Sequence, residues 1–258
     1  MFQVISLILD CVAILYQKRY NRLHRSIYGL SYDMYVLNLF SCCISIYCTL
    51  QYMFSPLVRN QLSRRFPLFY PRDETKVPIS VGLLIAEFMN VFCVCLVLKQ
   101  LIRYRSTQHI HQGLSIICVF VLLFAISFSI FTFACSSLYL PDQDMGRFGI
   151  FYLEHINYLW MIGNFLSAFH IVPQVTLNWM GSCTQGVSSK FVVLSMLSVL
   201  TAIIGNMLAG PKIFYKIPFN HIPIFRSLSQ LIFLSIILYQ AQFAYLGRKP
   251  ILPKKNTD

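Results

Sequence analysis

The stretch HIVPQVTLNW, residues 170–179, closes a long apolar run with a proline and a glutamine. Proline has no backbone N–H, and its ring clashes with the carbonyl four residues back, so Pro173 breaks or kinks a helix. Gln174 brings an amide oxygen and two N–H donors to a place where little else is polar. We therefore predict a helix that loosens at Pro173 and carries a polar group into the protein interior.

The composition predicts an all-helical membrane protein that forms one domain over residues 1–258. The chain is 57% hydrophobic and 12% charged, with a mean hydropathy of +0.62, whereas a soluble domain has about a quarter of its residues charged. Apolar stretches of about 20 residues, enough to cross a bilayer, recur along its whole length. The seven predicted spans are 2–17, 30–53, 78–98, 112–140, 150–176, 188–209 and 223–246.

The distribution of basic residues predicts the orientation. The first span is followed by the basic run QKRYNRLHR, residues 17–25, which is the reverse of the charge order in a secretory signal. We expect a retained helix with its N-terminus outside the cytosol and the C-terminus in the cytosol, in agreement with the positive-inside rule. The net charge of +12 lies in short loops beside the spans, so anionic lipid headgroups are the expected partners, and nucleic acid is not.

No motif for catalysis or for a cofactor is visible in the sequence. Eight of the nine cysteines lie inside predicted spans, where cysteine behaves as a small hydrophobe, and only Cys183 lies in a loop. Nothing has metal-ligand spacing in an accessible place. Nucleotide loops, zinc-binding helices and nucleophile elbows are missing from the chain. We predict no catalytic residue, no metal and no cofactor, and therefore no enzyme.

The chain repeats itself once without a gap. A shift of 157 residues places Gln17 on Gln174 and Asn21 on Asn178. The same shift matches a glycine and a serine, Gly29 with Gly186 and Ser31 with Ser188. This match predicts two parallel repeats, 2–98 and 150–246, joined by a linker span at 112–140, because an odd linker lets both repeats enter the membrane from the same side.

Each glutamine belongs to a polar stripe along one helix face. The stripe of the second repeat consists of Gly163, Ser167, His170, Gln174 and Asn178. The equivalent stripe of the first repeat consists of Ser6, Asp10, Ala13, Gln17 and Asn21. Polar side chains that face lipid are costly, so both stripes are expected to face the interior. They serve either as interhelical hydrogen bonds that hold the bundle together or as the lining of a central cavity, and their repeat-related positions favour a shared cavity.

The two matched stretches resemble the motifs of a known family. PQVTLNW, with glycine 12 and serine 14 residues after its glutamine, resembles the second motif of the PQ-loop family of seven-span membrane transporters. YQKRYNRLHRSIYGLSYDMYVLNL, residues 16–39, resembles the first motif, with Tyr16 in place of the proline. Within the family, 13–45 and 164–200 are most similar to the cystinosin-type lysosomal cystine exporters. The resemblance implies two three-helix bundles around a substrate path, with Pro173 as a hinge.

The resemblance also implies a function and a set of site residues. The expected activity is export of a small solute, cystine or another amino acid, from a vacuole or lysosome-like compartment; another endomembrane or the plasma membrane is the alternative location. The implied substrate-binding residues are Gln17, Asn38, Gln174 and Asn178. Asp33 matches an acid in the family's second span, His170 stands where the family has lysine, and Arg226 falls near a functional lysine before the last span.

The acidic residues that the family uses for proton coupling are not present at the matching positions of this chain. The coupling aspartate of the second motif is Ser195 here, and LSQLIFLSIILYQ, residues 228–240, contains no acid. The remaining candidates for proton coupling are Asp10, Asp33, Glu87 and His170. Three of them have a structural alternative: Asp33 as a helix-start residue, Glu87 paired with a basic side chain, and His170 as a hydrogen-bonded packing residue.

Two functional interpretations therefore stay open. In the first, the chain is a carrier whose partners are a small solute, lipids and, in a coupled version, protons. In the second, it no longer transports and acts as a sorting receptor or membrane adaptor. The basic loop with Lys18, Arg19, Arg22 and Arg25 would then be its binding surface. The sequence does not identify a protein partner for either.

Overall fold

The computed structural model describes residues 1–70, 77–137, 149–208 and 217–248, and its architecture in these ranges is made of helices joined by turns and loops. The prediction of an all-helical protein is thus confirmed. Within these ranges, five helices are long and apolar enough to cross a membrane. They are α2 (Tyr32–Phe54), α4 (Val81–Arg103), α5 (Ile116–Ser137), α8 (Ser189–Leu208) and the continuous segment Ile224–Ala244, formed by α9 (Ile224–Tyr239) and the π-helical turn η3 (Gln240–Ala244).

The remaining helices are more polar or shorter. They are α1 (Phe2–His24), α3 (Pro56–Arg65), the short 3₁₀ turn η1 (Arg105–Thr107), α6 (Tyr152–Phe169) and α7 (Val172–Gly181). The predicted first span ends at residue 17. α1 instead continues through the basic residues that follow and ends at His24. Of the predicted spans, residues 138–140 and 209 lie outside the described residues.

The predicted fifth span, 150–176, is two helices. α6 ends at Phe169 and α7 begins at Val172, with Pro173 in its first turn. A proline is tolerated there because the first N–H groups of a helix have no intrahelical acceptor. The interruption therefore falls at His170 and Ile171, immediately before the proline.

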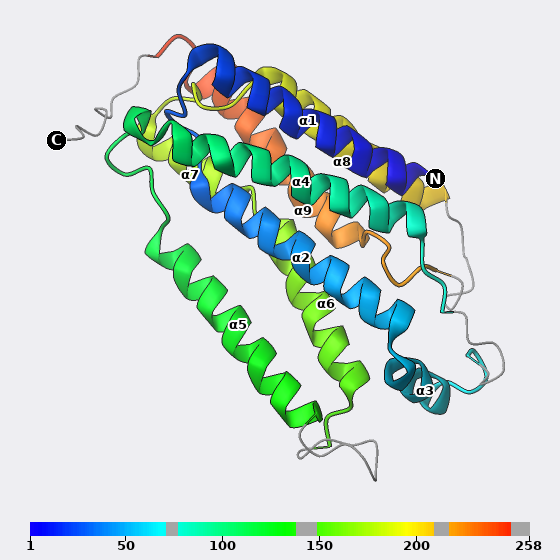
Figure 1. Ribbon diagram of the computed structural model, residues 1–258. Helices are drawn as coiled ribbons and strands as arrows, with labels where there is room; N and C mark the ends of the chain where they lie inside the picture. Colours follow the sequence, from blue (N-terminus) through cyan, green and yellow to red (C-terminus); the bar gives the residue numbers. More distant parts are fainter. Residues whose placement is uncertain (71–76, 138–148, 209–216, 249–258) are drawn as a thin grey trace.

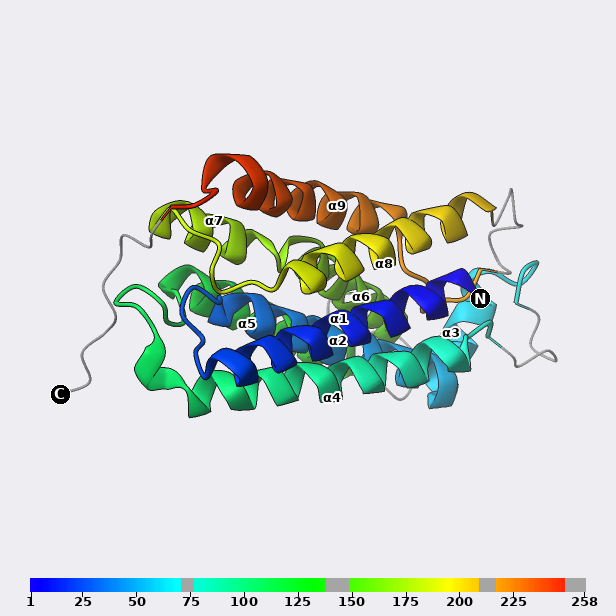
Figure 2. The same cartoon turned by 90° about the horizontal axis from the view of Figure 1, so that it is seen from above.

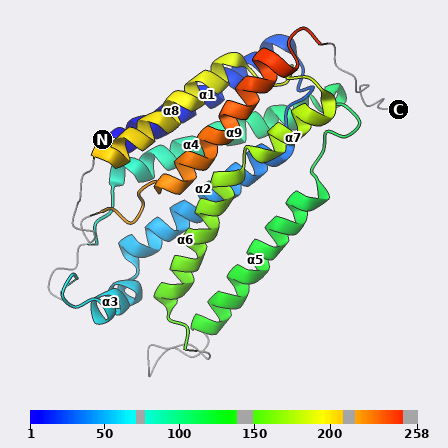
Figure 3. The same ribbon diagram turned by 180° about the vertical axis from the view of Figure 1, so that it is seen from behind.

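For description we divide the helices in chain order into a first bundle (α1, α2 and α4) and a second bundle (α6, α7, α8 and α9), and helices of each set pack against helices of the other (Figures 1 and 2). In the first bundle, α1 and α2 both pack on α4; in the second, α6, α7 and α8 pack on α9. Between the bundles, α1 runs along α8 and α2 runs along α6. α5 lies at the outside and packs mainly on α6 (Figure 3). The first helix of each bundle therefore pairs with the long helix that follows the glycine–serine turn of the other.

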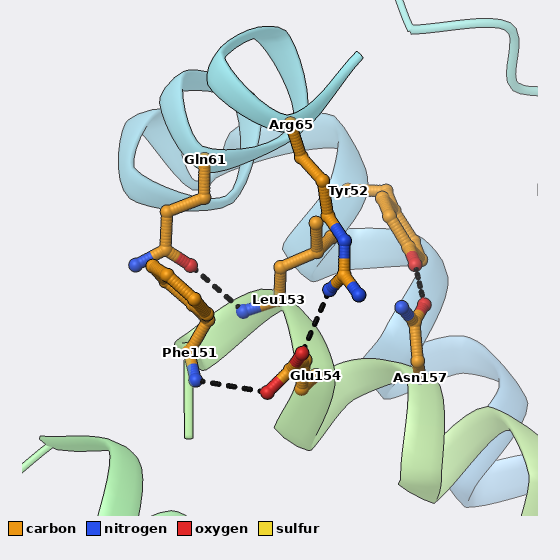
Figure 4. A network of polar contacts seen from close by, with 7 residues as sticks. All are labelled: Tyr52, Gln61, Arg65, Phe151, Leu153, Glu154 and Asn157. Carbon is orange, nitrogen blue, oxygen red and sulfur yellow. Dashed lines mark hydrogen bonds and ion pairs between the residues drawn. The ribbon is translucent and has the colours of Figure 1, made fainter. Parts of the chain in front are cut away.

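The short helix α3 fastens the end of α2 to the start of α6 (Figure 4). The side-chain oxygen of Gln61 accepts a hydrogen bond of 2.9 Å from the backbone N–H of Leu153. Arg65 forms an ion pair of 2.7 Å with Glu154. The first N–H groups of α6 would otherwise lack an acceptor, so Gln61 serves as a cap supplied by another helix.

The two bundles approach each other most closely at two glycines. Gly29, in the turn before α2, has a φ of 76°, in the left-handed region that glycine adopts readily. Gly186, in the turn before α8, lies directly against it: a Cβ on Gly186 would come within 2.5 Å of the Leu30 nitrogen and closer still to the Gly29 carbonyl. Only glycine at position 186 allows the backbones to approach this closely.

We predict that Gly186→Ala destabilises the protein by about 1–3 kcal/mol, the usual cost of overpacking, because the two turns must separate. Gly113→Ala is the matched control, since a Cβ there meets nothing within 4 Å, and its effect should stay within about 0.5 kcal/mol. Thermal unfolding of the purified proteins in detergent measures both. Equal melting temperatures for the two variants would contradict the close contact.

Candidate functional site

Gln17 is fully buried, and both ends of its amide are bonded. Its Nε2 donates to the Gly186 carbonyl at 2.9 Å and to Asn21 Oδ1 at 2.8 Å. Its Oε1 accepts from the backbone N–H of Ser188 at 2.8 Å. A helix of the first bundle thus supplies partners for the turn that precedes α8 in the second.

Gln174 makes the equivalent bonds from the second bundle to the turn of the first. Its Nε2 donates to the Gly29 carbonyl and to Asn178 Oδ1, both at 2.8 Å, and its Oε1 accepts from the Ser31 N–H at 2.8 Å. Gln174 is also fully buried. We call these two sets of bonds the exchange clamps. They occupy the end of the bundles at which α1 reaches His24, here named the His24 end.

The asparagines extend each clamp to the last long helix of its own bundle. Asn21 Nδ2 donates to Gln100 Oε1 at 3.4 Å, and Asn178 Nδ2 donates to Gln240 Oε1 at 3.1 Å. Gln240 stands at the start of the π-helical turn. The glutamine–asparagine pairs are therefore committed to holding the helices together in this conformation.

A small, partly enclosed cavity of about 40 Å³ lies between the bundles, nearer their middle. Its polar lining includes Asp10, Tyr35, Asn38, His170, Ser195 and Arg226. Tyr35 Oη, Ser195 Oγ and Arg226 Nε are buried and have no hydrogen-bond partner among the described residues. Buried polar groups are normally paired, so three orphaned atoms around one cavity indicate room for a polar guest. At about 10–15 Å³ per water, the cavity holds only a few waters in this state.

The structure separates the predicted site residues into two sets. Asp10, Asn38, His170 and Arg226 line the cavity. Gln17, Gln174 and Asn178 do not line it, because their amides are bonded in the clamps. Ser195, where the family carries its coupling aspartate, lies in the cavity wall. The polar stripes therefore face the protein interior, and at the His24 end their glutamines form hydrogen bonds with backbone groups.

The other candidates have specific partners. Asp33 Oδ1 accepts from the backbone N–H of Ser115 at 3.0 Å, which ties the start of α2 to the start of α5. His170 Nδ1 donates to the carbonyl of Ser167 at 2.7 Å, so Nε2 is its remaining ring nitrogen. A proton-coupling role for either side chain stays a prediction.

Asp10 and Glu87 lie within the first bundle. Asp10 Oδ2 accepts from Asn90 Nδ2 at 3.0 Å, and Glu87 Oε1 accepts from Ser45 Oγ at 2.5 Å. The guanidinium of Arg226, from the second bundle, acts electrostatically on both carboxyl groups. No group of three His, Cys, Asp or Glu side chains in the described ranges has a geometry that would hold a metal ion.

The opposite end of the cavity is closed by residues 217–223, here named the plug. Gln3 Nε2 donates to Asn206 Oδ1 at 2.8 Å, and Asn206 Nδ2 donates to the Ile222 carbonyl at 3.1 Å. Asn220 makes two bonds with the backbone of Ser80, at 2.9 and 3.0 Å. Sequence analysis did not identify these residues, because a lone amide at the end of an apolar run is ordinary at a membrane interface.

His221 gives the plug a titratable group. Burial lowers the pKa of His221 below its ordinary value, an effect partly offset by the bond of 3.0 Å from its Nδ1–H to the Pro218 carbonyl. Its ring also lies against Trp160, with centroids 6.2 Å apart. The docked plug therefore favours neutral His221.

The described residues define an all-helical protein with five helices of membrane-spanning length and apolarity. No protein-family model matches the chain. The uncharacterized protein YCL002C of Saccharomyces cerevisiae is 49% identical to it over 248 residues, which cover 95% of this chain and 94% of the yeast protein. The chain therefore belongs to the family of YCL002C.

We predict that acid loosens the plug. Once released, His221 titrates near its ordinary pKa of about 6.5, so below that pH the released plug binds a proton more strongly than the docked one, and stability falls as pH falls. In a Trp179→Phe background, Trp160 is the single tryptophan, and its emission should shift to the red between about pH 8 and pH 5. Adding His221→Gln should abolish the shift; an unchanged shift would assign it to another group.

Proposed function

We propose that this protein is a membrane carrier of the PQ-loop type that exports a small solute, cystine or another amino acid, from a vacuole or lysosome-like compartment. The observation that carries the proposal is the small polar cavity between the bundles, which has buried hydrogen-bonding atoms without partners among the described residues in its wall. A structural core would have these atoms paired. A carrier needs such groups for a solute that arrives and leaves.

The proposed architecture has seven spans in two parallel repeats, with α5 as the linker. The reciprocal packing of α1 on α8 and of α2 on α6 supports it. So do the exchange clamps, whose glutamines, glycines and serines all correspond by the shift of 157 residues. In this arrangement the plug lies on the luminal side and the clamps lie on the cytosolic side.

The proposed mechanism is alternating opening of the two closed ends. The plug releases towards the lumen while the clamps hold the cytosolic end, and the reverse opening follows. The break between α6 and α7 lies beside His170 at the cavity, so bending there moves the Gln174 clamp relative to the cavity wall. The cavity of about 40 Å³ must enlarge to accept an amino acid, so this conformation is the occluded one.

The cavity offers groups that suit a zwitterion. Arg226 offers a guanidinium for a solute carboxylate, and Asp10 offers carboxyl oxygens that can accept from an ammonium group. Asn38 can donate to one and accept from the other. Gln17, Gln174 and Asn178, which the family resemblance assigns to the substrate, act in this proposal as the cytosolic clamp.

We expect Asn38→Ala and Arg226→Gln each to reduce solute affinity. Losing one buried partner costs about 1–3 kcal/mol, which corresponds to about 5- to 150-fold. Uptake of a panel of labelled amino acids, cystine included, into liposomes that contain the purified protein measures the effect. Asn60→Ala is the matched control, since Asn60 is exposed on α3. No uptake of any amino acid would reject the proposed substrates, and an intact cellular phenotype in the Asn38→Ala, Arg226→Gln double variant would favour an adaptor.

The topology is tested separately. A glycosylatable tag at the N-terminus should be modified in the lumen, and the same tag at the C-terminus should not. This result follows from an odd number of spans with the basic C-terminal end of α1 in the cytosol. Modification of both tags, or of neither, would rule out seven spans.

A further inference from the structure

Two buried polar side chains of α4 face the first bundle's interior one helical turn apart. Glu87 is 7% exposed and Asn90 is 1% exposed. Each has one bonded half: Glu87 Oε1 accepts from Ser45 Oγ at 2.5 Å, and Asn90 Nδ2 donates to Asp10 Oδ2 at 3.0 Å. Both side chains are thereby fixed in place by neighbouring helices, Glu87 by α2 and Asn90 by α1.

The other half of each side chain has no partner. Glu87 Oε2 and Asn90 Oδ1 are buried and unbonded among the described residues. With Glu87 ionised, both atoms are acceptors, and neither can satisfy the other. A proton on Glu87 Oε2 turns that atom into a donor, and residues three apart on a helix are neighbours. One proton thus supplies the donor that both atoms lack.

The charges around Glu87 support the same conclusion. Arg226 from α9 acts electrostatically on Glu87 and also on Asp10 from α1, and Glu87 itself acts on the thiols of Cys42 and Cys48 from α2. If both carboxyl groups were ionised beside the one guanidinium, one excess negative charge would remain among apolar helices, where an uncompensated charge is strongly disfavoured. One bound proton removes the excess.

We propose that Glu87 is a proton-binding site of this protein, with the proton held between Glu87 Oε2 and Asn90 Oδ1. The O–H bond forms on Oε2 with a proton from water in the cavity, and the proton returns to water on release. Asp10 connects the site to the cavity, since it lines the cavity and accepts the bond from Asn90. The coupling of this proton to solute movement rests on the proposed function; the site itself does not.

Infrared difference spectroscopy of the full-length protein in lipid vesicles tests the site directly. Titration from acid to alkaline pH should remove the C=O band of one buried protonated carboxyl group. Glu87→Gln should abolish that band, and Glu154→Gln, at the partly exposed ion pair with Arg65, should leave it unchanged. A band that persists in Glu87→Gln would overturn the proposal.

A second variant covers the case in which Glu87→Gln does not fold. Asn90→Leu keeps the carboxyl group and removes its acceptor, so the band should move to the higher frequency of a carbonyl whose proton lacks a partner. An unmoved band would refute the Glu87–Asn90 geometry. Sodium is the competing monovalent cation. If the protein is more stable in sodium chloride than in choline chloride, and Glu87→Gln abolishes this difference, the site binds sodium and the proposed proton site is wrong.

Uptake into the same vesicles separates this inference from the proposed function. If both hold, Glu87→Gln should keep uptake without a pH gradient while the ratio of uptake with a gradient to uptake without one falls to unity. A Glu87 band in a protein that takes up no solute would reject the carrier and keep the site. Gradient-driven uptake that Glu87→Gln leaves intact, with no Glu87 band, would keep the carrier and reject the site.

Discussion

The fold depends on the exchange of backbone partners by Gln17 and Gln174. The turns before α2 and α8 leave a carbonyl and an N–H unpaired, and inside an apolar protein such groups must be satisfied internally. Each turn obtains both partners from a glutamine of the other bundle. The glutamine of each bundle bonds the turn of the other bundle, so the two bundles stabilise each other. The contact between Gly29 and Gly186 follows from it, because the amides reach across only when the turns touch.

The reciprocal bonds of the two glutamines form one end of the space that contains the cavity. The clamps hold the His24 end, and the plug, through Gln3, Asn206 and Asn220, holds the other. Between these two closures the helices enclose polar atoms that no neighbour satisfies. The energetic consequence is a molecule closed at both ends by a few hydrogen bonds each, with a small, incompletely paired interior.

The two bundles are alike in their clamps and different in their chemistry. The first helix of the second bundle is broken before Pro173, whereas α1, with Tyr16 at the matching position, is continuous. Asp10 and Glu87 belong to the first bundle, and Arg226 approaches them from the second. The helix break and the acidic groups thus belong to different bundles. Movement of the second bundle would change the distance between the guanidinium and the carboxyl groups, which links conformation to their charge.

The sequence by itself determined the helical class, the interruption at Pro173 and the inward direction of the polar stripes, because composition and periodicity are local properties. It also paired Gln17 with Gln174 and Gly29 with Gly186 as equivalent positions. Only the tertiary structure decided what those side chains bond. Periodicity gives the face of a helix on which Gln174 lies, but the backbone N–H that donates to it and the carbonyl that accepts from it are 143 and 145 residues away, respectively. For the same reason the sequence could not single out Gln3, Asn206 and Asn90, whose importance comes from partners on other helices. Only the tertiary structure distinguished Asn38 and Arg226, which line the cavity, from the glutamines, which form the clamps.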